Sequence, residues 1–515
     1  MTIMEPVVLQ DNSQAETVAV LKEEIRQLKA QLDWFKQQLF GEKSEKRLLE
    51  PNPHQPSLFD EQQAPQPEDV PTEKITYTRR KGKVRNDDDV TDQGLRFGPD
   101  VPVERIELSP AGLNDSNRDA YEIIGEKITR RLAQQPASYV VLEYVRPVLK
   151  HKPSGEICSV PAPDAVFEGS MADVSVLAGL LVDKFVYHLP LYRQHQRLKD
   201  AGITVSRSTL TQWVQKTIGL VEPIADAQKK HILQSKVLAM DETPIKAGRK
   251  KKGKLQATWF WPIYGEADEL AFTWSNSRGS QHIQEQLGDF QGILLTDGYA
   301  AYDRYARNKP GITQAQCWAH TRRYFVKAEA IEPDATARAL ELIGRLYQTE
   351  ARIKEQELKA EAALACRQKE SLPVAEQFFA WCHEQSQRTD LTPSNPLAKA
   401  LTYVRHHQEQ LKVFLGDPDI PIDTNHLERA LRIIPMGRKN WLFCWSEVGA
   451  EQVGVIQSLL TTCRSHDVNP YAYLVDVLQR ISLHPDQQII ELTPRVWKKK
   501  FADEPLLSDL ARVRQ

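Results

Sequence analysis

Two short stretches decide the fold of the central part of the chain: KVLAMDETP at residues 236–244 and GILLTDGYAAY at residues 292–302. In each, an apolar run typical of a buried strand ends in an acid, Asp241 in the first and Asp297 in the second. Open α/β sheets bind their ligands at the carboxyl ends of their strands. A single acid at such a place is often only a turn residue or a helix cap. The matched pair is therefore what predicts a functional site.

A third acid, Glu428, lies in the stretch IDTNHLERALRIIPMG. The spacing predicts a helix that starts near Asp423 or Thr424 and is ended by Pro435 and the glycine two residues later. Its apolar residues face a core, and Glu428 lies on the polar stripe together with Arg432. A simple pairing of Glu428 with Arg432 would stabilise the helix by only about 0.2 to 0.5 kcal/mol. That interpretation leaves the neighbouring basic residues unexplained.

Three carboxylates on two strand ends and one helix predict a site for divalent metal ions. Two such ions, about 3.5 to 4 Å apart, activate an attacking oxygen and stabilise the leaving oxygen of a phosphodiester. Hard oxygen ligands select Mg²⁺, and Mn²⁺ is expected as a substitute. No zinc is expected, because the six cysteines are scattered and none forms a C-x-x-C pair.

The charge of the chain is nearly balanced, with 67 Lys and Arg residues against 69 Asp and Glu residues. Uniform attraction to a polyanion is therefore excluded, and any contact with DNA must be local. The basic residues expected to contact DNA are Arg79, Arg80, Lys81, Lys83, Arg85, Arg207, Lys250, Lys251, Lys252, Arg322, Arg323, Arg432, Arg438 and Lys439. No apolar run approaches the roughly 20 residues that span a bilayer. We therefore expect no membrane contact and a cytoplasmic protein, which contact with DNA would place at the nucleoid.

Some of these basic groups have a plainer interpretation. Aspartates at residues 87–89 follow the cluster at residues 79–85, which can equally be a solvated linker of mixed charge. The basic run at residues 246–254 is either a clamp on DNA or the tip of a β-hairpin kept soluble by charge. His320, in the segment CWAHTRRYF, either holds the DNA backbone or is a structural histidine, since imidazole suits softer ions than Mg²⁺.

The N-terminal half carries two further patterns. Apolar residues at heptad spacing from Val18 to Leu39 predict a coiled coil, although one amphipathic helix lying on the rest of the protein explains them too. A helix, a tight turn at Ala201 and Gly202, and a second helix capped by Ser206 resemble a helix-turn-helix. Such hairpins are also common elements with a purely structural role.

Five motifs in order, MDETP, TDGYAAY, QCWAHTRRYF, NHLERALR and GRKNWLF, resemble the transposases of the insertion sequence 66 family, a group of bacterial mobile elements. The resemblance extends from the heptads through HLPLYRQ and RSTL to YAYLVDVLQRI, and so covers most of the chain. It implies a multidomain α/β protein with a ribonuclease-H-like core, in which Asp241, Asp297 and Glu428 form the catalytic triad. Asp241 and Asp297 are expected to bind Mg²⁺ directly, Asp297 to bridge two ions and Glu428 to orient one.

The resemblance also implies a helical insertion within the 131 residues (428 − 297) between the last two acids. The expected segments are a coiled-coil dimerisation segment (1–48), a flexible linker with the basic cluster (49–95), a small β-rich module (96–165), a helical DNA-binding-like region (166–232), the first part of the core (233–330), the helical insertion (331–415), the second part of the core with the catalytic helix (416–485) and a C-terminal tail (486–515). Family members usually carry a cysteine-rich zinc segment after the basic linker. Here the corresponding stretch, LSPAGLNDSNRDAYEIIGEKITRRL, has no cysteine.

The implied function is that of a DNA transposase, which binds terminal inverted repeats and cuts by metal-assisted attack of water. The freed 3′-hydroxyl then attacks target DNA. The expected partners are DNA, a second copy of the chain, because two ends must be brought together, and small accessory proteins of the same element. Two other hypotheses stay open: a DNA-binding regulator with an inactive core, and a ribonuclease-H-like nuclease that cuts branched DNA without the repeats.

Overall fold

The computed structural model describes residues 96–97, 101–108, 121–135, 138–251, 254–440, 444 and 446–513. All of them belong to the unit formed by residues 84–515. The expected coiled coil at residues 1–48, the linker at residues 49–95 with its cluster from Arg79 to Arg85, and Lys252 lie outside the described residues.

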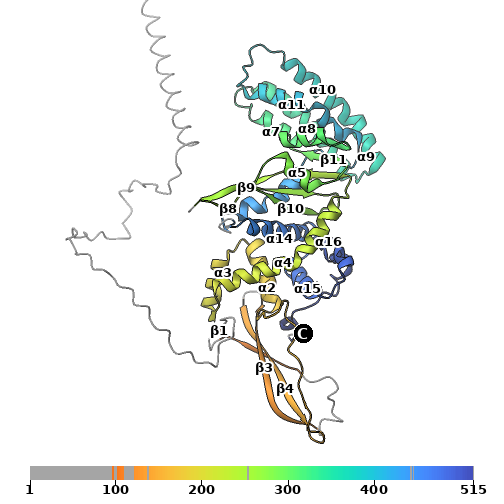
Figure 1. Cartoon of the computed structure of the whole chain (residues 1–515). Coiled ribbons are helices and arrows are strands. Elements are labelled where there is room, and N and C mark those ends of the chain that lie inside the picture. Colours follow the sequence, from red (N-terminus) through yellow and green to blue (C-terminus); the bar gives the residue numbers. More distant parts are fainter. Residues whose placement is uncertain are drawn as a thin grey trace, which may run out of the picture. The chain divides into compact units, whose positions relative to one another are not determined.

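A mixed sheet forms the centre of this unit (Figure 1). Its strands are β7 (Val237–Met240), β8 (Thr243–Lys251), β9 (Lys254–Tyr264), β10 (Leu270–Ser275), β11 (Gly292–Thr296) and β12 (Ile312–Gln316). Their order is β10-β9-β7-β11-β12, with β8 paired to β9; β7, β11 and β12 are parallel. The register sets Leu295 opposite Ala239. Asp241 and Asp297, two residues beyond these, therefore leave the same edge at the same level, as the sequence predicts.

Successive residues of the strands face two different cores, because strand side chains alternate between faces. Leu238 packs with α5 (Ser280–Leu287) and α6 (Ala300–Asn308) in the smaller core. Ala239 points the other way, into the larger core to which α14 (Glu447–Ser465) contributes. Both faces of the sheet are thus covered, as expected of a sheet with parallel strands.

Helix α14 also closes one edge of the sheet. Ser458 Oγ accepts a hydrogen bond from the Phe272 N–H of β10 at 2.8 Å, and Thr462 Oγ1 accepts one from the Leu270 N–H at 3.2 Å. Gly454 permits this approach, because a Cβ there would lie 2.8 Å from the Phe272 carbonyl oxygen. The two bonds occupy backbone groups of an edge strand that are otherwise open to pairing with another chain.

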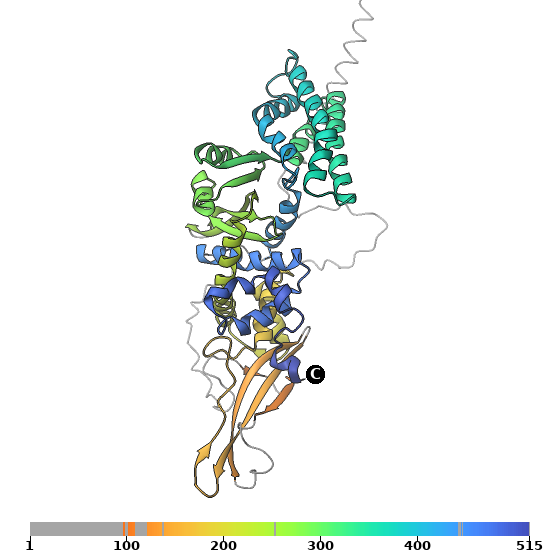
Figure 2. The same cartoon turned by 90° about the vertical axis from the view of Figure 1, so that its right-hand side faces the viewer.

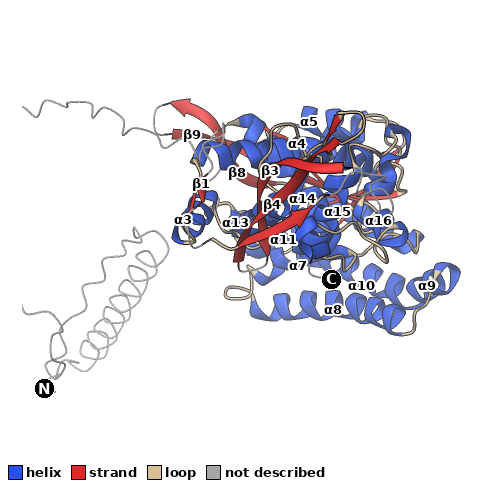
Figure 3. Ribbon diagram, turned by 90° about the horizontal axis from the view of Figure 1, so that it is seen from below, coloured by secondary structure: helices blue, strands red, loops and turns tan. Residues whose placement is uncertain are grey.

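A group of helices lies between β12 and the third acid (Figures 1 and 3), as expected for residues 331–415. They are α7 (Trp318–Val326), α8 (Pro333–Glu355), α9 (Ala360–Cys366), the π-helix η3 (Arg367–Ser371), α10 (Leu372–Gln385), α11 (Pro396–Lys412) and the 3₁₀ helix η4 (Val413–Gly416). Trp318 is fully buried among the rings of Phe378, Phe379 and Phe414. Its Nε1–H donates to the Leu411 carbonyl oxygen at 2.9 Å. This one side chain therefore joins α7 to α10 and α11.

The third acid lies on α12 (Asn425–Leu431), which is followed by α13 (Ile433–Gly437). The helical segment ends at Gly437 as predicted, but Pro435 lies inside α13 and does not end it. The segment is divided into two helices at Arg432, whose backbone keeps φ −53° and ψ −26°. Proline lacks an N–H, and its ring conflicts with the carbonyl four residues earlier, here that of Leu431. The break therefore comes one turn before the proline. The apolar side of both helices is buried, as predicted.

The described residues of the β-rich segment expected at residues 96–165 form the strands β1 (Arg96–Phe97), β2 (Val103–Glu107), β3 (Tyr121–Gln135), β4 (Ser138–His151) and β5 (Ile157–Cys158). β3 and β4 form a long antiparallel hairpin (Figure 2), and β2 and β5 pair with β4. The hydroxyl of Tyr144 on β4 donates to Asp509 Oδ2 at 2.6 Å. This bond joins the hairpin to the C-terminal helix of the described chain.

The predicted helix, tight turn and second helix are confirmed. α2 (Val174–Phe185) precedes α3 (Leu191–Asp200) and α4 (Arg207–Ile232). Gly202 in the turn has φ +78°, a backbone conformation that favours glycine. Ser206 Oγ accepts from the Thr209 N–H at 3.0 Å and caps α4. Between the two helices, β6 (Ile203–Thr204) pairs with β1.

The expected C-terminal tail at residues 486–515 is part of the packed structure. After α15 (Pro470–Arg480) follow η5 (Asp486–Leu492), α16 (Pro494–Lys500) and α17 (Asp509–Val513). Leu492, Trp497 and Leu510 from these elements are buried. Across the described ranges of the chain, no helix combines the length and the apolar character needed to cross a bilayer.

Candidate active site

Three carboxylates meet at the carboxyl ends of β7 and β11. Ligand oxygens of Asp241, Glu242 and Asp297 all lie within 4.8 Å of one another, which makes this the one group of the described chain that could hold a metal ion. Burial raises the pKa of Asp241 to about 8, and the neighbouring charges of Asp297 and Glu242 add to the shift. Neither aspartate has an ion-pair partner among the described residues. Asp241 is therefore mostly protonated at pH 7 in the absence of a cation, and a bound cation would favour its charged form.

The backbone holds both aspartates in place. The Glu242 N–H donates to Asp241 Oδ1 at 2.7 Å, and the Tyr299 N–H donates to Asp297 Oδ1 at 2.9 Å. The hydroxyl of Tyr403, from α11, donates to the carbonyl oxygen of Asp297 at 2.9 Å. Helix α11 therefore supports the turn that carries the second aspartate.

Gly298, directly after Asp297, is required by this turn. Its φ is +85°, and a Cβ would lie 2.6 Å from Gln316 Nε2 and 2.9 Å from the Tyr403 hydroxyl. We expect Gly298→Ala to lower the free energy of unfolding by about 2 to 4 kcal/mol, from backbone strain and overpacking. Urea unfolding followed by circular dichroism measures this. Gly344→Ala is the control, since nothing lies within 4 Å of its Cβ position in α8 and alanine there is expected to stabilise by about 0.5 to 1 kcal/mol.

Glu242 is a member of the cluster that the sequence analysis missed. Its side chain is only 2% exposed, and Arg278 holds it with Nε 2.9 Å from Oε1. The hydroxyl of Tyr302 donates to Oε2 at 3.0 Å. Arg278 in turn stacks on Tyr299, with its Cζ 4.0 Å from the ring centroid. The sequence did contain a signal for this residue, because Glu242 stands directly beside Asp241 and the motif TDGYAAY supplies the nearby tyrosines.

The bond from Tyr302 to Glu242 gives a measurable prediction. Burial raises the pKa of Tyr302 well above its ordinary value, so the hydroxyl is protonated and donates. We expect Tyr302→Phe to lower the free energy of unfolding by about 1 to 3 kcal/mol, because a buried carboxylate loses a donor. Tyr305→Phe, one turn later on α6, is the matched control. Its hydroxyl is buried without a hydrogen-bond partner among the described residues, so urea unfolding should show a neutral or stabilising change.

Glu428 lies beside this cluster rather than in it. Its charge is near enough to contribute, as a smaller effect, to the raised pKa of Asp241. Its carboxylate is held by Arg323, whose Nη2 lies 2.6 Å from Oε1 and also contacts Oε2. The alternative pairing with Arg432, four residues on, is therefore wrong. Because α7 approaches α12 in the folded chain, Glu428 has a partner 105 residues away, whose Nη2 contacts both of its oxygens.

His320 lies next to this ion pair. Burial lowers its pKa, so the ring is neutral at pH 7. Its Nε2 lies 3.0 Å from Arg323 Nη1 and 3.6 Å from Glu428 Oε1. The structure thus places His320 as a support of the Arg323 and Glu428 pair, and it does not belong to the close group of three acids.

The basic run that starts at Lys246 lies on β8 and the start of β9, which pair antiparallel. This is the place that the β-hairpin interpretation gives it. Lys250 and Lys251 are exposed there. Arg438 donates from Nη1 to the carbonyl oxygen of Pro244 at 2.6 Å and thereby holds the segment after α13 against β8. Lys250 and Lys251 thus lie at the end of β8 that is far from Asp241, whereas Arg438 contacts its beginning.

The other predicted DNA contacts are exposed. Arg207 lies at the start of α4 with its guanidinium carbon 5.0 Å from the ring centroid of Tyr192. Arg322, Arg432 and Lys439 are also accessible on the surface. Contact of these side chains with DNA stays a prediction.

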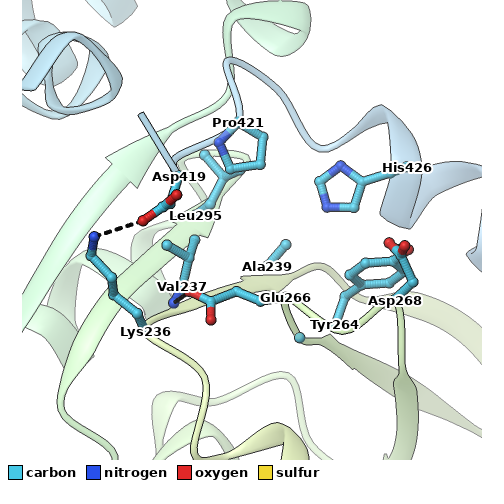
Figure 4. Close-up of a pocket in the computed structure, with 11 residues that line it drawn as sticks. Lys236, Val237, Ala239, Tyr264, Glu266, Asp268, Leu295, Asp419, Pro421 and His426 are labelled. Atoms are coloured by element: carbon cyan, nitrogen blue, oxygen red, sulfur yellow. Dashed lines mark hydrogen bonds and ion pairs between the residues drawn. The ribbon is translucent and has the colours of Figure 1, made fainter. Parts of the chain in front are cut away.

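A separate cavity of about 460 Å³ lies behind α12 (Figure 4). His426 lines it and packs on Tyr264, with ring centroids 4.7 Å apart. On the opposite wall, Lys236 Nζ pairs with Asp419 at 3.0 Å. Glu428 is two residues beyond His426 and so faces the other side of the helix. None of the three predicted catalytic acids lines this cavity.

Comparison with known protein families identifies the family of the chain. The family model described as "Transposase IS66 family" matches residues 169–452, a range that contains the acid cluster and Glu428. This chain belongs to the IS66 family of transposases. A second model, "IS66 C-terminal element", matches residues 458–495, and a third, "Transposase C of IS166 homeodomain", matches residues 27–106. The resemblance predicted from the five motifs is confirmed.

Relatives of this IS66 family chain include two proteins of Sinorhizobium fredii. The uncharacterized protein y4hP is 31% identical over 432 residues, which cover 79% of this chain and 78% of the relative. The uncharacterized protein y4jD is 32% identical over 394 residues, which cover 73% and 76%. A solved structure, the Drosophila P element transposase strand transfer complex, matches with a TM-score of 0.22 and 12% identity over 68% of this chain and 87% of that one. A TM-score of this size does not establish a common fold.

Proposed function

We propose that this IS66 family chain is the DNA transposase of an insertion sequence. It binds terminal inverted repeats and cuts and joins DNA with Asp241, Asp297 and Glu428 as its acids. The observation that carries the proposal is the meeting of Asp241 and Asp297, which adjacent parallel strands deliver within 4.8 Å of each other. Glu428 lies close enough to act electrostatically on Asp241.

The sheet supports a ribonuclease-H-like core. β7 is the central strand. On one side β9 runs antiparallel to it and β10 runs antiparallel to β9, and on the other side β11 and β12 run parallel to β7. The two aspartates follow β7 and β11, which are neighbours in this order. The helices from α8 to α11 then form an insertion between the second and third acids.

The residues of the site fit Mg²⁺, with Mn²⁺ as a substitute, because carboxylate oxygens are the ligands that these hard ions prefer. Two bound ions would activate the attacking oxygen and stabilise the leaving oxygen of a phosphodiester. Asp241 and Asp297 would hold such ions directly, and Glu428 would complete the ligand set. Glu242, held by Arg278 and Tyr302, fixes the backbone next to Asp241.

The partners follow from the same function. The exposed cations Lys250, Lys251, Arg322 and Arg432 supply contacts to DNA phosphates that offset repulsion from the acids. A second copy, joined through the heptads at residues 1–48, brings two DNA ends together. Small accessory proteins of the same element are further expected partners, and the protein acts in the cytoplasm at the nucleoid.

Cleavage of a labelled duplex that carries the element's own end tests the proposal, in Mg²⁺, in Mn²⁺ and in a chelator. We expect nicking at that end only when a metal is present. Binding of the end without cleavage in either metal, with the companion proteins added, indicates a regulator and overturns the proposal. Cutting of branched DNA that lacks the repeats, with no cutting at the end, indicates a structure-specific nuclease.

A further inference from the structure

The ion pair between Arg323 and Glu428 sets the third acid apart from the other two. Arg323 contacts both carboxylate oxygens of Glu428, and His320 Nε2 approaches the same carboxylate at 3.6 Å. Asp241 and Asp297 have no such partner among the described residues, and their close group excludes Glu428. In this conformation two acids are open to a metal ion and the third is neutralised by a guanidinium.

A guanidinium and a metal ion compete for the same carboxylate. Arg323 Nη2 contacts both oxygens of Glu428, so it uses the lone pairs and the charge that a metal ion would use. Binding of Glu428 to a metal ion therefore requires Arg323 to loosen its hold. The guanidinium of Arg323 must then find another partner, because an unpaired positive charge beside a metal ion is unfavourable.

The surroundings of Arg323 allow such an exchange. Its side chain is 47% exposed, against 22% for Glu428, so it is open to a ligand from solution. Guanidinium groups bind phosphate with the same fork geometry that they use for carboxylate. The N-terminal end of α7 is meanwhile fixed by two backbone hydrogen bonds. The Cys317 N–H donates to Thr296 O at 3.0 Å, and the Trp318 N–H donates to Ile422 O at 3.1 Å. The side chains of Arg323 and Glu428 can therefore move while the start of α7 stays in place.

We propose that Arg323 is a positioning residue that couples DNA binding to completion of the metal site. A DNA phosphate takes the guanidinium, and the freed Glu428 carboxylate turns to the metal ions bound by the aspartates. This inference rests on the proposed function, which supplies DNA and metal as ligands. Because coupling between two ligands is reciprocal, DNA must tighten metal binding, and the effect must pass through Arg323.

Binding of Mn²⁺ to the full chain tests this without reliance on activity. Free Mn²⁺ is followed by electron paramagnetic resonance, with and without a saturating duplex carrying the element's end, after subtraction of the ions that the duplex binds alone. For DNA-free Arg323→Gln we expect Mn²⁺ to bind about three- to tenfold tighter than for the parent, from loss of a charged hydrogen-bonded competitor. DNA should tighten binding by a similar factor in the parent and leave Arg323→Gln unchanged.

Two controls separate this coupling from a simple charge effect. Arg338→Gln removes the same charge from an arginine that pairs with Glu341 on α8, outside the acid cluster and the predicted DNA contacts, and its Mn²⁺ affinity and DNA response should match the parent. Arg323→Gln in a Glu428→Gln background should have no effect of its own, since the partner of Arg323 is absent. Equal affinities of parent and Arg323→Gln, or an effect that persists in the Glu428→Gln background, overturn the proposal.

The same measurement distinguishes failure of the inference from failure of the proposed function. Asp297→Asn should weaken Mn²⁺ binding with or without DNA. If it does not, the acid cluster is not the metal site and the proposed function fails, together with the coupling built on it. If Asp297→Asn weakens binding while Arg323→Gln behaves as the parent, the metal site stands and only the coupling is rejected.

Discussion

Asp297→Asn is expected to slow metal-dependent cleavage of the element's end by about a thousandfold or more, the range seen when a member of a catalytic set is removed. Asparagine keeps the size of the side chain and an oxygen for the Tyr299 N–H, so the turn after β11 is retained. What is lost is a negatively charged ligand of a hard metal ion. Asp241→Asn is expected to have an effect of the same order. Single-turnover rates on labelled DNA measure both.

Asp289→Asn is the matched control for this experiment. It removes one carboxylate charge from an exposed side chain that pairs with Lys309 at 3.5 Å, outside the acid cluster. Its cleavage rate should equal that of the parent, and all three variants should bind the end with the parent's affinity. A rate for Asp297→Asn within tenfold of the parent, with binding retained, would mean that the metal ions are held elsewhere.

Trp318→Ala should have the largest effect on stability, a decrease of about 3 to 5 kcal/mol in the free energy of unfolding, as for other large core aromatic residues. The indole is fully buried against three phenylalanines and donates to the Leu411 carbonyl oxygen. Its loss leaves a cavity at the junction of α7, α10 and α11 and an unpaired carbonyl group. Urea unfolding followed by circular dichroism measures the change.

Trp318→Phe provides the comparison. It keeps an aromatic ring in the core and loses the hydrogen bond and part of the volume, so a smaller decrease of about 1 to 3 kcal/mol is expected. A decrease below about 1 kcal/mol for Trp318→Ala would show that α7 does not depend on this contact, because a buried truncation of this size normally costs several times more.

The parts of the fold that follow local rules could be predicted from the sequence. Apolar runs with a terminal acid marked β7 and β11, and Ser206 marked the start of α4, because strand burial and helix capping depend on residues near in sequence. Adjacent parallel strands then place Asp241 and Asp297 together without further information. The family itself was recognisable from five motifs in order.

The missed features depend on contacts between distant residues. Arg323 and Glu428 are 105 residues apart, and no periodicity indicates that α7 meets α12. Glu242 lay in a quoted motif, but its role needs the fold to bring Arg278 and Tyr302 around it. The division of the helix at Arg432 does follow a local rule. Proline disturbs the carbonyl four residues before it, so the effect of Pro435 appears one turn earlier than the sequence analysis expected.

The hydrogen bond from the Trp318 N–H to the Ile422 carbonyl oxygen has a topological consequence. The chain leaves the sheet at the start of α7, runs through α8 to α11, and returns to the same point before α12. A segment whose two ends are joined in this way can be lengthened or shortened, provided that Arg323 and Tyr403 keep their contacts, since loop closure depends only weakly on loop length. The number of residues between Asp297 and Glu428 therefore places no constraint on how far apart their carboxylates lie.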